Sequence, residues 1–135
     1  AASDMQTLRE PKLLLFHSDT GNTGTINFRF TRFTLGSALL LGAWHAFDFG
    51  SQDHSQLWRF PEYGLKLGLP TGPARLFDGS APKRWALQPY TRPFGHGTVI
   101  VNPTDQPVTA TMQGKDVTIE AQDAAFISYK LKASP

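Results

Sequence analysis

The sequence has no cysteine among its 135 residues. Disulfide bonds, thiolate nucleophiles and sulfur-ligated zinc are therefore excluded, whereas the compartment, reducing or oxidising, stays open. A long hydrophobic run is also missing, because the most apolar stretch, 35–47, is interrupted by glycine, serine and histidine and is shorter than the roughly 20 residues that span a bilayer. Residues 1–9 lack the features of a signal peptide. We expect a soluble chain without a membrane partner, secreted or periplasmic if a signal peptide has been removed.

Charge of one sign is not in excess, since 13 Lys and Arg residues face 11 Asp and Glu residues. The basic pairs at 29 and 32, 83–84, and 130 and 132 are separated by apolar segments. Nucleic-acid binding depends on many simultaneous cationic contacts from one face. We therefore expect no nucleic-acid partner.

Several motifs of enzymes and cofactor sites are absent. The four histidines, at 17, 45, 54 and 96, show neither the spacing of a helical zinc pair nor a His-Glu-x-x-His motif. There is no Gly-x-Ser-x-Gly nucleophile motif, and Gly36-Ser37-Ala38 favours close packing of a helix. The glycines at 21 and 24 lack the lysine of a phosphate-binding loop. We expect no metal and no cofactor.

The first part of the chain has the pattern of a βαβ unit. The apolar run 12–17 predicts a strand covered on both faces, as in a parallel sheet. A helix follows, capped by Thr25 or Asn27 and ending at Gly42, and 44–49 alternates like a second strand. Residues 51–81 are rich in proline, glycine and aromatics and predict an ordered surface connector with short helical turns.

Short alternating segments separated by turns dominate the rest of the chain. The strands expected there are 84–88, 90–94, 98–102, 107–112, 116–121 and 124–131. Evenly spaced short strands are typical of a β-sandwich or an open barrel, and we expect the sandwich. The sequence therefore predicts an α+β, mainly β fold, in which a βαβ-like segment with one principal helix and its connector (1–82) precede and pack with an antiparallel β-sandwich (83–135).

Carboxylates at strand ends give the chain its clearest chemical pattern. Asp19 and Asp48 follow the two strands of the βαβ unit, at the edge where active sites of parallel sheets form. Glu62 comes later, in an aromatic segment. Glycoside hydrolysis requires two carboxyl groups beside the scissile bond. Asp48 and Glu62 are the candidate catalytic residues, while a strand-end turn for Asp48 and an ion pair with Arg59 for Glu62 are the structural alternatives.

Aromatic rings near these carboxylates suit the apolar faces of sugars, although tryptophans more often belong to a hydrophobic core. Because His45 and Asp48 lie three residues apart in a strand, we expect them on opposite sides. The candidate ligand-binding residues are Asp19, Trp44, His45, Trp58 and Tyr63.

Four segments are similar to glycoside-hydrolase-like (β/α)8-barrel proteins. They are RFTLGSALLLGAWHAFDFG (32–50), WRFPEY (58–63), LGLPTGP (67–73) and YTRPFGHGTVIVNPT (90–104). The resemblance spans roughly 12–130 and implies the end of the barrel followed by a C-terminal β-sandwich domain. Such a barrel runs to about 250 residues, so earlier strands and their carboxylates are missing from this chain. The strand edges of the βαβ unit must then pair with the sandwich, with another copy or with a missing upstream segment.

Three functions are compatible with these patterns. The first is a carbohydrate-associated β module, without a complete active site of its own, that binds an oligosaccharide. The second is a small glycan-active hydrolase completed by dimerisation. The third is a structural or oligomerisation domain without a ligand. We expect no catalysis by the isolated chain, and glycoside hydrolysis if it has any.

Overall fold

The computed structural model describes residues 7–10, 12–50, 54, 58–80 and 87–129. Its elements follow in the order β1 (Leu15–Asp19), α2 (Phe28–Leu41), β2 (Trp44–Asp48), the 3-10 helix η1 (Pro61–Gly64), β3 (Arg75–Leu76), β4 (Tyr90–Phe94), β5 (Gly97–Asn102), β6 (Val108–Met112), β7 (Lys115–Ile119) and β8 (Asp123–Ser128). The fold is α+β and mainly β, as the sequence predicts. Residues 84–86 of the expected strand 84–88 and the expected boundary after residue 82 fall in a part of the chain that is not described, and residues 87 and 88 lie outside any strand.

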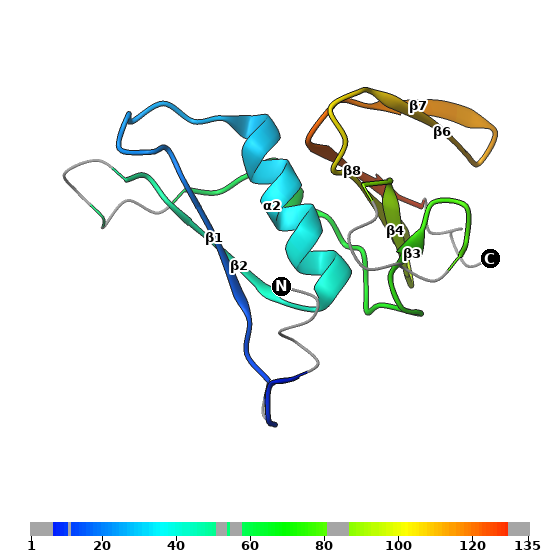
Figure 1. Ribbon diagram of the computed structural model, residues 1–135, viewed down its shortest axis with the longest axis horizontal. Coiled ribbons are helices and arrows are strands. Elements are labelled where there is room, and N and C mark those ends of the chain that lie inside the picture. Colours follow the sequence, from blue (N-terminus) through cyan, green and yellow to red (C-terminus); the bar gives the residue numbers. More distant parts are fainter. Residues whose placement is uncertain (1–6, 11, 51–53, 55–57, 81–86, 130–135) are drawn as a thin grey trace, which may run out of the picture.

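The βαβ unit forms as expected. β1 and β2 pair in parallel, from Leu15 opposite Trp44 to Asp19 opposite Asp48, and α2 provides the crossover between them. Parallel neighbours need such a crossover because a tight turn can only reverse the chain direction. In Figure 1 the helix lies between this parallel pair and the antiparallel strands, so α2 packs on both.

The two ends of α2 are set by the residues that the sequence points to. Asn27 is the N-cap, and its Oδ1 accepts a hydrogen bond of 3.1 Å from the backbone N–H of Phe30. Such caps contribute about 1 kcal/mol. Gly42 ends the helix in the left-handed conformation, at a φ of 68°, which glycine adopts without a steric penalty.

α2 approaches the sheet very closely at Gly36. A Cβ at this position would lie 2.6 Å from the Cβ of Ala124 and 2.8 Å from Cγ2 of Val101. Ala38, two residues on, is only 1% exposed. The Gly36-Ser37-Ala38 segment therefore serves helix packing, as its small side chains predict.

The C-terminal half forms the expected sandwich. β3, β4, β5 and β8 form one antiparallel sheet in that order, and β6 and β7 form a two-stranded sheet. The alternation of β5 divides the core, because Val99 and Val101 belong to the cluster that includes helix residues, whereas Ile100 packs with Ala110 and Ile119 of the hairpin. α2 and the β6–β7 hairpin thus cover opposite faces of the central sheet (Figure 1). The two-residue strand β3 is an addition that the sequence pattern does not reveal.

A buried asparagine joins the hairpin to the central sheet. Asn102, at the end of β5, is fully buried, and its side-chain amide donates hydrogen bonds to the carbonyl oxygens of Gln106, Ile119 and Glu120. Its Oδ1 accepts from the backbone and the hydroxyl of Thr104. The Asn-Pro-Thr turn is therefore a polar link between the two layers of the sandwich.

One prediction about β1 is wrong. The strand is covered on one face only, by α2, while Leu13 and Leu15 on the other face are 68% and 55% exposed. Trp44, the register partner of Leu15, is 68% exposed on that same face. Within the described residues β1 and β2 pair only with each other, so the sandwich does not complete their sheet. An apolar run predicts that a strand is buried, but it does not show whether the same chain supplies the residues that cover it.

Candidate functional site at the carboxyl ends of β1 and β2

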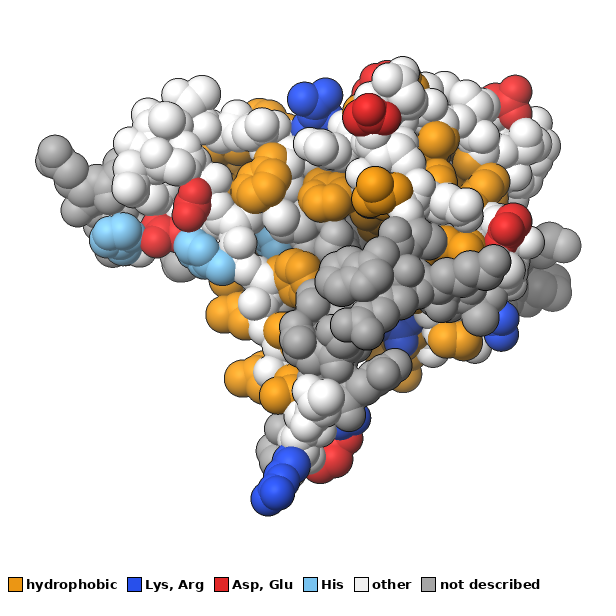
Figure 2. Space-filling view, viewed as in Figure 1, with side chains coloured by type: hydrophobic (Ala, Val, Ile, Leu, Met, Phe, Trp, Pro, Cys, Tyr) orange, Lys and Arg blue, Asp and Glu red, His pale blue; other side chains and the backbone are white. Residues whose placement is uncertain are grey.

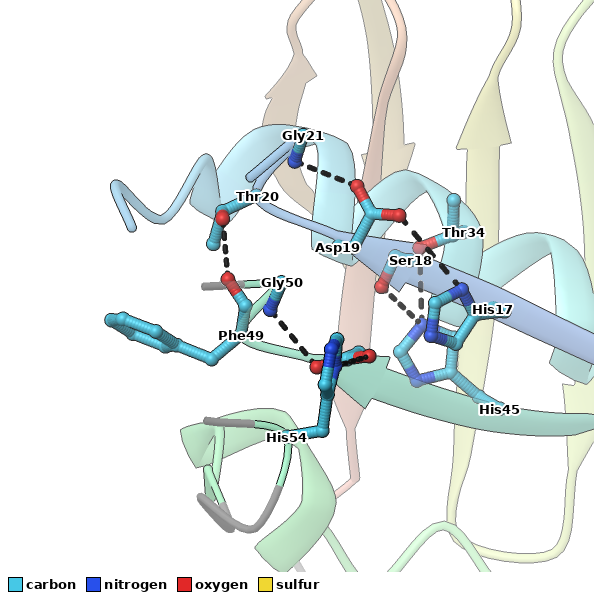
Figure 3. Close-up of polar contacts among 11 residues, drawn as sticks. His17, Ser18, Asp19, Thr20, Gly21, Thr34, His45, Phe49, Gly50 and His54 are labelled. Atoms are coloured by element: carbon cyan, nitrogen blue, oxygen red, sulfur yellow. Dashed lines mark hydrogen bonds and ion pairs between the residues drawn. The ribbon is translucent and has the colours of Figure 1, made fainter. Parts of the chain in front are cut away.

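Asp19 and Asp48 lie side by side at the carboxyl ends of the parallel strands. They are register partners, and partners in a parallel pair project to the same face of the sheet. One oxygen of each carboxylate accepts a backbone N–H two residues on, from Gly21 at 2.7 Å and from Gly50 at 2.9 Å (Figure 3). Both glycines have positive φ, 62° and 67°, which allows the chain to turn immediately after each strand. Each aspartate thus forms its turn with one oxygen and directs the other oxygen elsewhere.

The two turns are linked to each other. The Thr20 hydroxyl donates a hydrogen bond to the backbone carbonyl of Phe49 and accepts one from the N–H of Gly24. Thr20 is buried, so this link is shielded from water. The loop 21–24 therefore helps to fix the spacing of the two carboxylates.

Histidines accompany the second oxygen of each aspartate. Nδ1 of His54 lies 2.8 Å from Oδ2 of Asp48, and Nδ1 of His17 lies 4.0 Å from Oδ2 of Asp19. The N–H of Gly50 and then the His54 side chain stabilise the Asp48 anion and hold its pKa below the usual value. A general acid of a glycosidase needs a raised pKa, so Asp48 is suited to accept hydrogen bonds or to act as a base or nucleophile.

His45 lies on the opposite side of β2, as its spacing from Asp48 predicts. Its Nε2 is 3.2 Å from Oγ of Ser18 on β1 and 3.0 Å from Oγ1 of Thr34 on α2, and its Nδ1 is 2.8 Å from the Tyr63 hydroxyl on η1 (Figure 3 shows the first two contacts). Burial, and then the nearby His17, lower the pKa of His45. His45 therefore joins four elements from inside the fold instead of facing the aspartates.

Aromatic rings form a cluster beside this edge. Phe60 lies at the centre of the cluster and is only 2% exposed. Its ring centroid lies 4.9 Å from that of Phe47 and 5.6 Å from that of Tyr63. Trp58 packs on Phe60 and also on Phe49, the residue after Asp48, with centroid distances of 6.3 Å and 6.1 Å. Trp58 remains 42% exposed. Part of the Trp58 side chain is thus exposed beside Phe49, the residue that follows Asp48.

Glu62 has different neighbours from Asp48. It lines a hollow of about 370 Å³ together with Arg32, Leu65 and Phe126. Arg32 forms a bidentate pair with Asp123 of β8, with distances of 2.8 Å and 2.6 Å, and this contact is the main reason for its raised pKa. The described contacts place Glu62 at the interface of η1 with the sandwich, and its partnership with Asp48 stays a prediction.

Trp44 lies at the amino end of β2, whereas Asp48 lies at the carboxyl end. At about 3.3 Å per residue the two are roughly 13 Å apart along the strand. Trp44 shares its surroundings with Leu13 and Leu15 on the uncovered face. Figure 2 shows histidine and acidic side chains together at the left of the molecule and hydrophobic side chains further along the strands.

The sequence predicts Asp19, Asp48, Trp58 and Tyr63 as site residues, but not the residues that position them. Ser18, Thr20 and Thr34 are buried polar residues, and a hydroxyl inside an apolar strand or on the inner face of a helix is the signal that could have found them. Phe49 and Phe60 were not singled out from the sequence. His54 gave no signal, because its contact with Asp48 depends on how the connector folds.

A search of the described ranges for metal-ligand clusters and for membrane-spanning helices found neither. There, no three His, Cys, Asp or Glu side chains are grouped so that they could hold a metal ion. In the same ranges no helix has the length and hydrophobicity to cross a membrane. Comparison with protein-family models gave no match, and no curated protein matches the chain significantly.

Proposed function

We propose that this chain is a carbohydrate-associated module, corresponding to the end of a (β/α)8 barrel and the β-sandwich that follows it. In this proposal β1 and β2 are two adjacent strands of the barrel. The remaining strands come from another part of the polypeptide or from a partner chain. The observation that carries the proposal is the pairing of Asp19 with Asp48 at the carboxyl ends of two parallel strands whose inner face is uncovered.

The uncovered face supports the barrel part of the proposal. All-parallel sheets occur almost only with both faces covered, and their open edges attract further strands. Leu13, Leu15 and Trp44 are more than half exposed on the face opposite α2. A second layer or further strands would remove these side chains from water, at about 25 cal/mol per Å² of apolar surface.

The carboxyl edge supports the carbohydrate part. Ionised carboxylates accept hydrogen bonds from sugar hydroxyls, and an indole face stacks on the apolar face of a pyranose ring. Asp19 and Asp48 offer the first kind of group, and Trp58 offers the second through its position beside Phe49. In a barrel this edge is the side on which substrates bind.

The test is a glycan array, followed by calorimetry with the oligosaccharide that binds best. Trp58→Ala should weaken binding about two- to tenfold, since aromatic contacts of this kind contribute roughly 0.5–1.5 kcal/mol. Trp44→Ala is the matched control, because it removes an exposed indole at the other end of β2 and should leave affinity unchanged. Absence of any bound glycan, or equal losses in both variants, would contradict the proposal.

The same uncovered face favours a second candidate, an oligomerisation domain. A second copy of the chain could cover Leu13, Leu15 and Trp44 in place of further barrel strands. Light scattering of the wild type and of Leu15→Lys separates the two. A dimer that Leu15→Lys converts to a monomer, together with no glycan binding, would favour oligomerisation as the function.

A further inference from the structure

The hollow between η1, α2 and β8 has the size and lining of a small binding site. Its volume of about 370 Å³ lies within the range of roughly 300–1,000 Å³ that is usual for small-molecule sites. Pro61, Leu65 and Phe126 supply apolar surface, and Arg32 and Glu62 are its two charged side chains. None of its lining residues belongs to the Asp19 and Asp48 turns, so it is a separate place on the molecule.

The guanidinium of Arg32 is held in place from behind the hollow. Asp123 accepts hydrogen bonds from its Nε at 2.8 Å and from its Nη2 at 2.6 Å. Asp123 is itself 8% exposed and also accepts the backbone N–H of Ala124 at 2.7 Å. A guanidinium has five N–H donors, so three are left over, and none of them donates to another described residue. Because the guanidinium is already fixed, a ligand does not have to order it on binding.

Glu62 places an acceptor near these donors. The pKa of Arg32 is raised mainly by its hydrogen bond to Asp123, and the charge of Glu62 adds to this in the same direction, so the two side chains are close. They form no ion pair with each other, because the bidentate contact turns Arg32 towards Asp123. Within the described residues the Glu62 carboxylate also accepts no hydrogen bond. The hollow therefore offers free donors and free acceptors together.

We infer that this hollow is a binding subsite for one neutral sugar ring. A sugar hydroxyl both donates and accepts, so neighbouring hydroxyls can accept from Arg32 and donate to Glu62 at the same time. The C–H face of the ring then packs on Leu65 and Phe126.

The charges favour a neutral ligand over a charged one. Asp123 balances the charge of Arg32, and Glu62 leaves one negative charge in excess at neutral pH, so an anionic ligand is repelled. The guanidinium opposes an ammonium group in turn. A hydroxyl group satisfies both sides without adding charge.

This inference rests on the proposed function for the class of ligand, but it uses other residues. The hollow borders the aromatic cluster, because Pro61 follows Phe60, on which Trp58 packs. The module would then hold its glycan at two places, the Trp58 face and the hollow.

The test is an NMR titration of the full chain with the methyl glycosides of glucose, galactose and mannose. At least one glycoside should shift the Nε–H signal of Arg32 and the amide signals of Leu65 and Ala125, with the weak, millimolar affinity of a single ring. Added sodium chloride should leave this affinity unchanged, because no ion pair with the ligand is screened. Absence of these shifts with all three glycosides would overturn the inference.

Glu62→Gln tests the acceptor. It should weaken binding of the glycoside about three- to tenfold, because a charge-assisted hydrogen bond becomes a neutral one. Glu120→Gln is the matched control, since it makes the same charge change at an exposed carboxylate outside the hollow and should leave the affinity unchanged. Equal losses in the two variants, or no loss in Glu62→Gln, would count against the subsite.

A measurement on the wild type keeps the test decisive if Glu62→Gln folds poorly. Methyl glucuronide, which adds a carboxylate to the same ring, should bind more weakly than methyl glucoside. Stronger binding of the glucuronide that fades with added salt would make the hollow an anion site at Arg32 and would overturn the inference.

The hollow and the Trp58 face fail in different ways. If a glycoside shifts the signals of the hollow while no glycan binding depends on Trp58, the subsite stands and the proposed function falls. If binding is lost in Trp58→Ala but not in Glu62→Gln, the proposed function stands and the subsite is overturned.

Discussion

Asp19 and Asp48 are register partners at the carboxyl ends of β1 and β2, and each accepts the N–H of a glycine two residues on. The Asp-x-Gly pattern thus recurs at equivalent places on neighbouring strands. The repeated turn accounts for the hydrogen bond that one carboxylate oxygen of each aspartate accepts. The second oxygens, together with His17 and His54, are what make this edge a candidate site.

The first prediction concerns acid stability. Since the pKa of Asp48 is lowered in the fold, the unfolded chain binds more protons below about pH 4. Asp48 therefore stabilises the fold above that pH, and this contribution disappears as the pH falls through the folded-state pKa. Urea unfolding at a series of acidic pH values should show a smaller loss for Asp48→Asn than for the wild type.

The control for this experiment is His54→Gln, which removes the second cause of the lowered pKa but keeps the Gly50 hydrogen bond. Its loss of stability in acid should lie between those of the wild type and Asp48→Asn. Identical acid curves for the wild type and Asp48→Asn would show that Asp48 makes no such contribution.

The second prediction concerns the ion pair between α2 and β8. Arg32→Met leaves the Asp123 carboxylate, 8% exposed, without its bidentate partner. We expect a loss of about 2–4 kcal/mol in the free energy of unfolding, which is less than the roughly 3–5 kcal/mol for fully buried pairs because Arg32 is 32% exposed. Arg32→Met combined with Asp123→Asn should recover part of this loss. A strictly additive double mutant would mean that the pair is not coupled.

The third prediction tests the close approach of α2 to the sheet. Gly36→Ala places a methyl group 2.6 Å from the Cβ of Ala124, so the helix must shift. Overpacking of this kind costs about 1–3 kcal/mol, which outweighs the gain of roughly 1 kcal/mol in helix propensity. Thermal unfolding should show the loss, and Ala124→Gly in the same chain should reduce it. Gly64→Ala, which meets open space, is the matched control.

The fourth prediction concerns Asn102. Replacement by Ala removes the side-chain hydrogen bond to the buried carbonyl of Ile119 and the acceptor of the Thr104 backbone N–H. Each unsatisfied buried group costs about 1–3 kcal/mol, so we expect a total loss of about 2–4 kcal/mol by urea unfolding. Thr111→Ala removes an exposed hydroxyl of the same hairpin and should cost less than about 1 kcal/mol. Equal losses in the two variants would contradict a linking role for Asn102.

The sequence predicts the local structure well where the chemistry is local. Asn27 and Gly42 set the ends of α2, and the alternation in β5 matches its two packed faces. Long-range features are different. The contact of Arg32 with Asp123 spans 91 residues, and no spacing rule reveals it. The sequence also places strong apolar residues in β1, but their burial depends on strands or layers that the described residues do not supply.

The candidate site was predictable only where its residues follow from local sequence patterns. Asp19 and Asp48 follow strands, and a parallel pair brings strand ends to one edge. Glu62 and Trp44 were grouped with them by sequence proximity and residue type alone. In the fold Trp44 lies at the far end of β2 and Glu62 beside Arg32.

A backbone NMR titration with the best oligosaccharide from the array tests the central claim most directly. The account predicts that the amide signals of Gly21 and Gly50 and the indole signal of Trp58 shift together as the sugar is added. The amides of the β6–β7 hairpin should stay in place. Shifts confined to the sandwich, or no shift at the Asp19 and Asp48 turns, would contradict it.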